Sequence, residues 1–282
     1  MQIKEIESKS ILTPSKLPDA DYVVNPYTGC AFGCTYCYAS FMGRYVGKDN
    51  ADWGNYVFVK INAPELLKKD LHRIKDKGEG KSIFFSSVTD PYQGLESKHQ
   101  LTRQCLQILL DYGFNGKVSI LTKSHMALRD LDLFKKFKNI EVGFTITSTD
   151  DKIARYFEKN APNVSQRLDA MKRLNIEGIK TYAFVGPLLP HFAAEKETLD
   201  KLFDAISKTG TKELYVEHIN LSKYILDRFL KEMPDLDKGI LEKFYSSKGK
   251  EYREELSRLV IELVDKYNLK LRLGSAIYHK EL

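Results

Sequence analysis

The sequence predicts an α/β fold of parallel strands and helices, and it favours a partial barrel over a flat sheet. Six short runs rich in β-branched and aromatic residues alternate with segments of helical periodicity. The fourth run, residues 140–147, carries large apolar residues on one face and small or polar residues on the other. A flat sheet covered by helices on both faces is apolar throughout, whereas a barrel with a ligand in its mouth can keep a polar inner face.

The elements follow one another in a regular βα order. The predicted strands are 21–27, 81–88, 117–123, 140–147, 179–186 and 213–220. The predicted helices between them are 63–77, 101–113, 128–139, 164–178 and 196–210, several of which end in Gly or Asn. Such a repeat gives a parallel sheet with helices outside it. We expect residues 1–20 to form an N-terminal arm, 21–220 the barrel core and 221–282 a helical extension packed on the barrel.

Composition places the chain among ordinary globular proteins. Its 282 residues are 43% hydrophobic and carry a net charge of +6, with lysines spread among acidic residues. Nucleic acid is a possible but not a favoured partner, because phosphate binding needs positive charge concentrated on one face. No stretch approaches the roughly 18 apolar residues of a membrane span, and the N-terminus lacks the apolar centre of a signal peptide. We therefore expect a cytoplasmic protein with no membrane partner, in which clustered cysteines bind metal or act in catalysis.

Three of the four cysteines lie within eight residues, directly after the first predicted strand. Cys30, Cys34 and Cys37 form a C-x3-C-x2-C pattern, and Gly33 allows the tight turn that brings three thiolates to one cluster. Three thiolates hold three irons of a [4Fe–4S] cluster and leave the fourth open to a substrate or cofactor. The alternative is a zinc site completed by His99, His125 or His218. The fourth cysteine, Cys105, falls on the apolar stripe of a predicted helix and is expected in the core.

Polar residues also follow the other predicted strands, so a shared site is expected at the carboxyl edge of the sheet. These strand ends are "SSVTDP" at 86–91, Lys123 with Ser124, "TITSTDD" at 145–151, "GPLLP" at 186–190, and Glu217 to Asn220.

The motifs "NPYTGCAFGCTYCYA", "SSVTDPY" and "SILTKS" resemble the radical S-adenosylmethionine (SAM) superfamily, in its spore photoproduct lyase-related branch. The resemblance extends from about Asp21 to Asn220. It implies a partial (β/α)6 TIM barrel, a [4Fe–4S] cluster, and SAM whose amino and carboxylate groups chelate the open iron. It also implies an external electron donor, such as a reductase, ferredoxin or flavodoxin, and a 5′-deoxyadenosyl radical that abstracts hydrogen from a substrate.

The same resemblance assigns residues around SAM. Tyr36 would lie beside the adenine, mainly through its backbone, and Thr89 and Asp90 beside the methionine amino group. Lys123 would pair with the SAM carboxylate, since a buried zwitterion needs a cation there. The alternative for Lys123 is a solvent-facing lysine at a strand end.

Further candidates lie on the predicted inner face and on the cysteine loop. Thr145 and Thr147 are candidates for the ribose hydroxyls. Glu217 shares its strand face with Tyr215 and is a candidate substrate contact. Tyr38 matches a tyrosine that photoproduct lyase uses in hydrogen return, although packing of an aromatic against the loop explains it nearly as well.

The sequence thus predicts a radical SAM enzyme with an unidentified substrate. One alternative is a DNA photoproduct repair lyase, and another is a non-catalytic zinc or iron–sulfur module. Photoproduct lyase completes its reaction with a cysteine just after the second strand, where this chain has Ser87, or Val88 if the alignment shifts by one. We therefore expect that this protein does not repair spore photoproduct.

Overall fold

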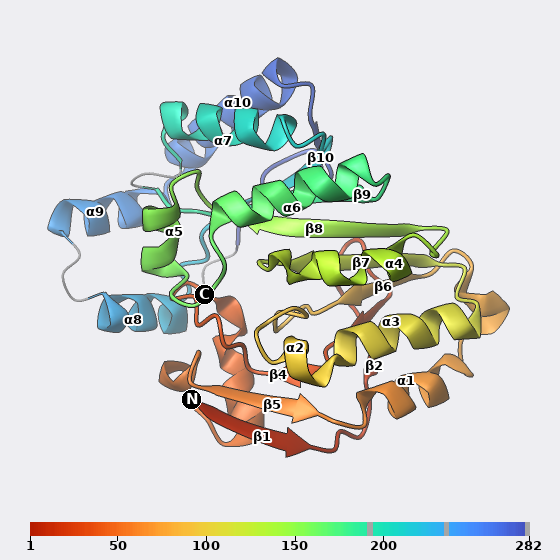
Figure 1. The fold of residues 1–282 in the computed structure, drawn as a ribbon. Coiled ribbons are helices and arrows are strands. Elements are labelled where there is room, and N and C mark those ends of the chain that lie inside the picture. Colours follow the sequence, from red (N-terminus) through yellow and green to blue (C-terminus); the bar gives the residue numbers. More distant parts are fainter. Residues whose placement is uncertain (191–193, 234–236, 280–282) are drawn as a thin grey trace.

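The computed structural model describes residues 1–190, 194–233 and 237–279, and its centre is an eight-stranded sheet (Figure 1). The strand order is β11-β10-β9-β8-β7-β6-β3-β2, and every pair is parallel except β2 with β3. The strands are β2 (Leu12–Pro14), β3 (Tyr22–Val24), β6 (Ser82–Phe85), β7 (Lys117–Thr122), β8 (Ile140–Ile146), β9 (Lys180–Leu188), β10 (Glu213–His218) and β11 (Lys270–Leu271). All six predicted strands are present, as β3 and β6 to β10.

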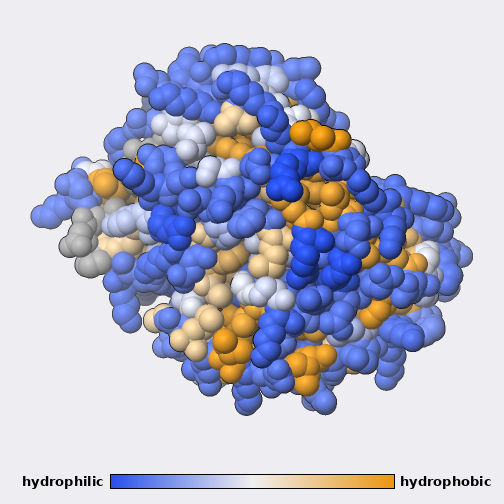
Figure 2. Space-filling model, in the orientation of Figure 1, coloured by the Kyte–Doolittle hydropathy of each residue, from blue (hydrophilic) through white to orange (hydrophobic). Residues whose placement is uncertain are grey.

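Helices cover one face of this curved sheet: α3, α4 and α6 lie in front of the strands in Figure 1, and α7 and α10 lie at the top of the view. The side of this layer that faces solvent is mostly hydrophilic (Figure 2). The α-helices are α1 (Ala63–Leu71), α2 (Glu96–His99), α3 (Leu101–Tyr112), α4 (Leu131–Phe134), α5 (Asp151–Phe157), α6 (Val164–Ile176), α7 (Lys196–Ser207), α8 (Lys223–Glu232), α9 (Lys238–Ser246) and α10 (Lys250–Lys266). The 3₁₀ helices are η1 (Tyr38–Val46), η2 (Asn50–Asp52), η3 (Lys75–Gly78) and η4 (His125–Asp130).

Helix α3 illustrates how the pattern of apolar residues determines packing. Leu101, Cys105 and Leu109 recur every four residues and are all buried. The helix ends at Gly113, whose φ of +75° allows its N–H to return to the carbonyl of Leu109. Cys105 is thus a core thiol on an outer helix, as predicted.

The opposite face of the sheet is an inner face that is partly open. Along β6 and β10 the side chains alternate between fully buried and partly exposed. The buried ones face the helices, and the partly exposed ones, including Phe84, Tyr215 and Glu217, face inward. This pattern and the free edges at β2 and β11 make the fold an open, partial (β/α)6 barrel, which confirms the predicted class.

A second, three-stranded sheet was not predicted. It has the order β1-β5-β4, formed by Gln2–Ile6, Tyr56–Lys60 and Tyr27–Thr28. The N-terminal residues therefore contribute β1 to this small sheet and β2 to the edge of the main one. Strand β4 leads directly into the cysteine loop, so the small sheet holds the beginning of that loop.

The C-terminal part contains the expected helices, α8 to α10, and ends along the main sheet. Strand β11 pairs with β10, and Ile277 then forms backbone hydrogen bonds with Val216 and His218. The division into arm, core and extension stays a prediction. Within the described residues, no helix has the length and apolar character needed to cross a membrane.

Candidate functional site

The cysteine loop lies at the carboxyl edge of the main sheet, after β3 and β4. Cys30 and Cys34 are buried, Cys37 is partly buried, and all three are free thiols. Gly33 has a φ of +61°, and a Cβ on Gly29, at φ +89°, would lie 2.4 Å from the Tyr56 carbonyl oxygen. Both glycines are therefore required for the tight course of the loop.

The thiols lie in a setting that favours a bound cation. Burial raises the pKa of each thiol, to about 12 for Cys34, and Lys123 opposes this rise at Cys34 and Cys37. Metal coordination deprotonates a thiol outright, so iron would supply the charge that buried thiolates need. The donor set fits an iron–sulfur cluster.

Lys123 points toward the cysteine loop and not into solvent. Its Nζ lies 5.7 Å from the centroid of the Tyr36 ring. Burial lowers the pKa of Lys123, but Cys34 and Glu158 more than offset this, and the net pKa is raised. In the described part of the chain, no carboxylate forms an ion pair with Lys123. A partly buried cation that forms no direct ion pair among these residues fits the carboxylate of a zwitterionic cofactor.

A buried network that the sequence did not reveal fixes Tyr36. Its hydroxyl donates to Glu158, which is also ion-paired with Arg167, and both charged residues are only 1% exposed. Thr147 Oγ1 donates to Glu158 at 3.3 Å, and Arg167 donates to the Thr145 carbonyl at 3.0 Å. The network therefore joins the cysteine loop to the carboxyl end of β8.

Asp90 is a buried carboxylate that organises the next strand end. It accepts hydrogen bonds from the backbone N–H groups of Tyr92, at 2.9 Å, and Lys123, at 2.8 Å, and from Thr122 Oγ1, at 2.6 Å. Thr89 donates to the Gly29 carbonyl at 2.5 Å. Both residues thus lie beside the cysteine loop and Lys123. The three hydrogen bonds that Asp90 accepts from described residues leave one of its roughly four acceptor positions free.

The register of the sheet places the candidate threonines on the inner face. Thr145 pairs with Phe184, and Phe184 with Tyr215, so these three side chains form one row. Lys123 follows Thr122, the partner of Phe144, and therefore continues this row on β7. Thr147 Oγ1 is already bonded to Glu158, whereas the Thr145 hydroxyl has no hydrogen bond to any described residue and is available on the inner face.

Tyr38 and Ser87 are brought together at the mouth of the barrel. The Tyr38 hydroxyl donates to the Ser87 carbonyl, and the Ser87 hydroxyl accepts from Asn25. Tyr38 is 43% exposed, so it does not serve as a core residue.

Glu217 faces inward and has a partner that sequence reasoning missed. His279 Nε2 lies 2.8 Å from Glu217 Oε1, and this contact raises the pKa of His279. The C-terminal segment brings His279 there because Ile277 continues the sheet alongside Glu217. His218, the next residue, points outward and is buried against the rings of Tyr252 and Tyr278.

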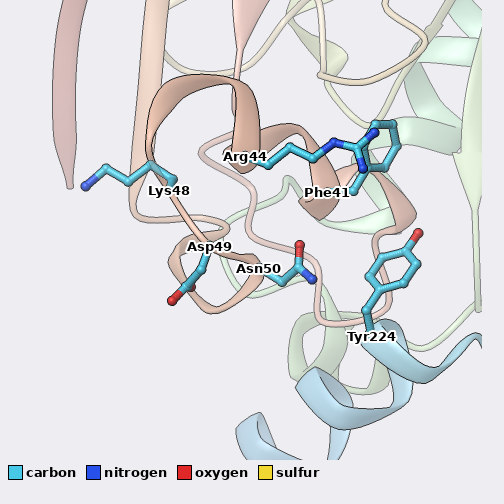
Figure 3. Close-up of a pocket in the computed structure, with 6 residues that line it drawn as sticks. All are labelled: Phe41, Arg44, Lys48, Asp49, Asn50 and Tyr224. Carbon is cyan, nitrogen blue, oxygen red and sulfur yellow. The ribbon is translucent and has the colours of Figure 1, made fainter.

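A pocket of about 630 Å³ adjoins the cysteine loop (Figure 3). The Arg44 guanidinium lies 5.2 Å from the Phe41 ring centroid, and the Tyr224 hydroxyl donates to the Tyr38 carbonyl at 3.1 Å. The remaining lining residues are Lys48, Asp49 and Asn50.

The described residues contain no group of three His, Cys, Asp or Glu side chains arranged around a single metal ion. The histidines considered as zinc ligands lie elsewhere: His99 is 4.0 Å from Glu5, His125 is exposed on η4, and His218 packs against α10. The cysteines of an iron–sulfur cluster bind different irons, so they need not converge on one ion.

Comparisons with known proteins agree with this geometry. Residues 24–203 match the radical SAM superfamily. An uncharacterized protein of Methanocaldococcus jannaschii is 39% identical over 78% of this chain and 79% of its own length. Spore photoproduct lyase of Bacillus subtilis is 24% identical over 89% of this chain and 68% of its own length.

Solved structures show the same fold. Spore photoproduct lyase complexed with dinucleoside spore photoproduct superposes with a TM-score of 0.70 at 17% identity, covering 95% of this chain and 81% of that one. The family match spans more than half of the chain and includes all three clustered cysteines. The chain therefore belongs to the radical SAM superfamily, and it is an enzyme with the fold of spore photoproduct lyase.

Proposed function

We propose that Cys30, Cys34 and Cys37 hold a [4Fe–4S] cluster, that SAM binds beside it, and that the enzyme abstracts hydrogen from a substrate at the inner face. The observation that carries this proposal is the position of Lys123. A cation that forms no direct ion pair among the described residues lies at the same sheet edge as three free thiols. When bound and reduced, the cluster and SAM supply a carbon radical that abstracts hydrogen.

The protein's own residues would bind and orient the cofactor. Lys123 binds the SAM carboxylate, and Asp90 fixes the backbone of Lys123 while offering an acceptor to the SAM ammonium. Tyr36 is held by Glu158, which leaves its backbone to contact the adenine. Thr145 offers its hydroxyl to the ribose, and Thr147 supports the network behind it.

The substrate would lie on the inner face near Glu217 and Tyr38. Apolar or aromatic side chains that are partly exposed line this face, namely Phe84, Leu121, Phe184 and Tyr215. Glu217 with His279 supplies hydrogen-bonding groups above them. This lining suits a substrate with both an apolar part and a polar group. An external one-electron donor is required, and we place the enzyme in the cytoplasm.

Anaerobic reconstitution tests the proposal directly. We expect about four iron and four sulfide per chain, and slow formation of 5′-deoxyadenosine from SAM after reduction. Alanine at Cys30, Cys34 or Cys37 removes the cluster, because each lost thiolate leaves one iron without its anchor. Cys105→Ala is the matched control and retains it. Zinc at one equivalent without iron, or iron unchanged in the triple alanine variant, would refute the assignment.

A further inference from the structure

Arg228 reaches the cysteine loop from α8, in the C-terminal part of the chain. Its Nη2 donates to the carbonyl oxygen of Cys34 at 2.7 Å and lies 3.4 Å from that of Gly33. Its Nε donates to Glu232 Oε1 at 2.6 Å. Because Arg228 is only 4% exposed, its guanidinium is a buried positive charge directly behind the loop.

This charge is incompletely balanced. Glu232 is its carboxylate partner, but Glu232 also pairs with Lys159 at 3.0 Å, so one negative charge is shared between two cations. The Arg228 Nη1 atom is buried and has no hydrogen-bond partner among the residues that the structure describes. A buried donor without a partner is costly, and its presence beside the cysteines indicates a role other than stability.

Neighbouring contacts fix the position of this guanidinium. The Phe229 ring stacks on Phe157 with centroids 5.7 Å apart, and the Phe157 carbonyl accepts from the backbone N–H of Thr35. Asn160 donates to the carbonyls of Ala31 and Phe32. Helices α5 and α8 thus hold the loop together, and Arg228 supplies the only charged side chain that bonds to its backbone carbonyls from Ala31 to Cys34 within the described residues.

We propose that Arg228 is a positioning residue that raises the reduction potential of the cluster held by Cys30, Cys34 and Cys37. Reduction adds one electron, taken from the external donor, and makes the cluster more negative. A fixed cation in surroundings of low dielectric stabilises the reduced form more than the oxidised form. The inference rests on the proposed cluster. It means that α8, through Arg228, makes that cluster easier to reduce.

The test is a redox titration of the reconstituted cluster, followed by electron paramagnetic resonance. At the wild-type midpoint, we expect R228Q to have a ratio of reduced to oxidised cluster about tenfold lower, a shift of ~59 mV for one electron. R228K keeps the charge and restores most of the wild-type potential. Lys231→Gln is the matched control, because it removes one positive charge from an exposed position on the same helix. The reduction potential of the cluster in this variant should equal that of the wild type, because solvent screens an exposed charge.

A second variant decides the question if R228Q fails to fold or to bind iron. Glu232→Gln keeps Arg228 and removes its compensating charge, so the potential should become less negative. A fully loaded R228Q with the wild-type potential, or a Glu232→Gln protein with no shift, would overturn the role of Arg228. Absence of iron from the wild-type protein would instead overturn the proposed function.

Discussion

Arg272 forms a bidentate ion pair with Glu141, with N–O distances of 2.7 and 2.6 Å, although the two residues are 131 positions apart. The guanidinium also lies 4.2 Å from the centroid of the Tyr182 ring. Glu141 is near the amino end of β8, so the pair closes the inner face at the end opposite the cysteine loop. It thereby links the C-terminal segment to the middle of the sheet.

Glu141→Gln should destabilise the protein by about 3–5 kcal/mol, because it leaves Arg272 buried without its main partner. Arg272 and Lys117 lower the pKa of Glu141 from 4.5 to about 2 against the opposing effect of burial. The stabilisation is therefore fully present above pH 4.5 and is lost as the pH falls toward 2. Urea denaturation from pH 7 to pH 3 should show the difference between the variant and wild type shrinking. Glu177→Gln, at an exposed pair with Lys135, is the control and should leave the stability nearly unchanged.

Lys123→Ala should weaken SAM binding ten- to hundredfold while leaving the iron content nearly unchanged. A charge-assisted hydrogen bond contributes roughly 1.5–3 kcal/mol, which corresponds to that loss of affinity. Calorimetric titration of SAM into the reconstituted wild-type and Lys123→Ala proteins measures the two dissociation constants. Lys135→Ala, at an exposed lysine, provides the comparison. Equal dissociation constants for Lys123→Ala and wild type would show that Lys123 does not contact the cofactor.

Tyr36→Phe should lower the free energy of unfolding by about 1–3 kcal/mol, because Glu158 loses one of its buried donors. Thr147 and Arg167 still hold the carboxylate, so we expect the protein to fold and to bind iron. Thermal unfolding gives the measurement. Tyr112→Phe removes a hydrogen bond to the Ile74 carbonyl away from the site and tests whether the effect is specific. A larger loss for Tyr112→Phe would contradict the importance given to the Glu158 network.

His279→Gln should reduce stability most at low pH. The contact with Glu217 is the main cause of the raised pKa of His279, so the stabilisation is present below the ordinary pKa of 6.5 and disappears as the pH rises through the raised value. Denaturation curves at pH 5.5 and pH 9 compare the two conditions. Glu217→Gln should return the pKa of His279, followed by nuclear magnetic resonance, toward 6.5. An unchanged pKa in that variant would argue against the pair.

Repair of spore photoproduct is not expected, despite the shared fold. By the resemblance described above, Ser87, or Val88 if the alignment shifts by one, would take the place of the hydrogen-donating cysteine of photoproduct lyase, and neither residue supplies an S–H bond. Cys105 cannot replace it, because it is buried on α3 on the outer face. Incubation of reduced protein and SAM with DNA that contains the lesion gives the answer. Stoichiometric, multiple-turnover release of thymine at a rate unaffected by Cys105→Ala would prove this prediction wrong.

The barrel and the cysteine loop could be predicted, because strand alternation and ligand spacing are both visible in a few consecutive residues of the sequence. Strand β5 was not predicted, although its sequence YVFVK carries the same β-branched and aromatic signal as the predicted strands. The buried pair of Glu158 and Arg167 was not predicted, because charged residues are normally exposed. Their pairing depends on how α5 and α6 pack against β8. Arg228 had a detectable signal, since it lies on the same helix stripe as the buried Ile225.

The hydrogen bond from Arg228 to the Cys34 carbonyl joins residues 194 positions apart. During synthesis the cysteine loop is therefore made long before the side chain that completes its backbone hydrogen bonds. Contacts of such long range form late in folding, because the intervening chain must first be ordered. We therefore expect the cysteine loop to complete its backbone hydrogen bonds only after helix α8 has docked against it.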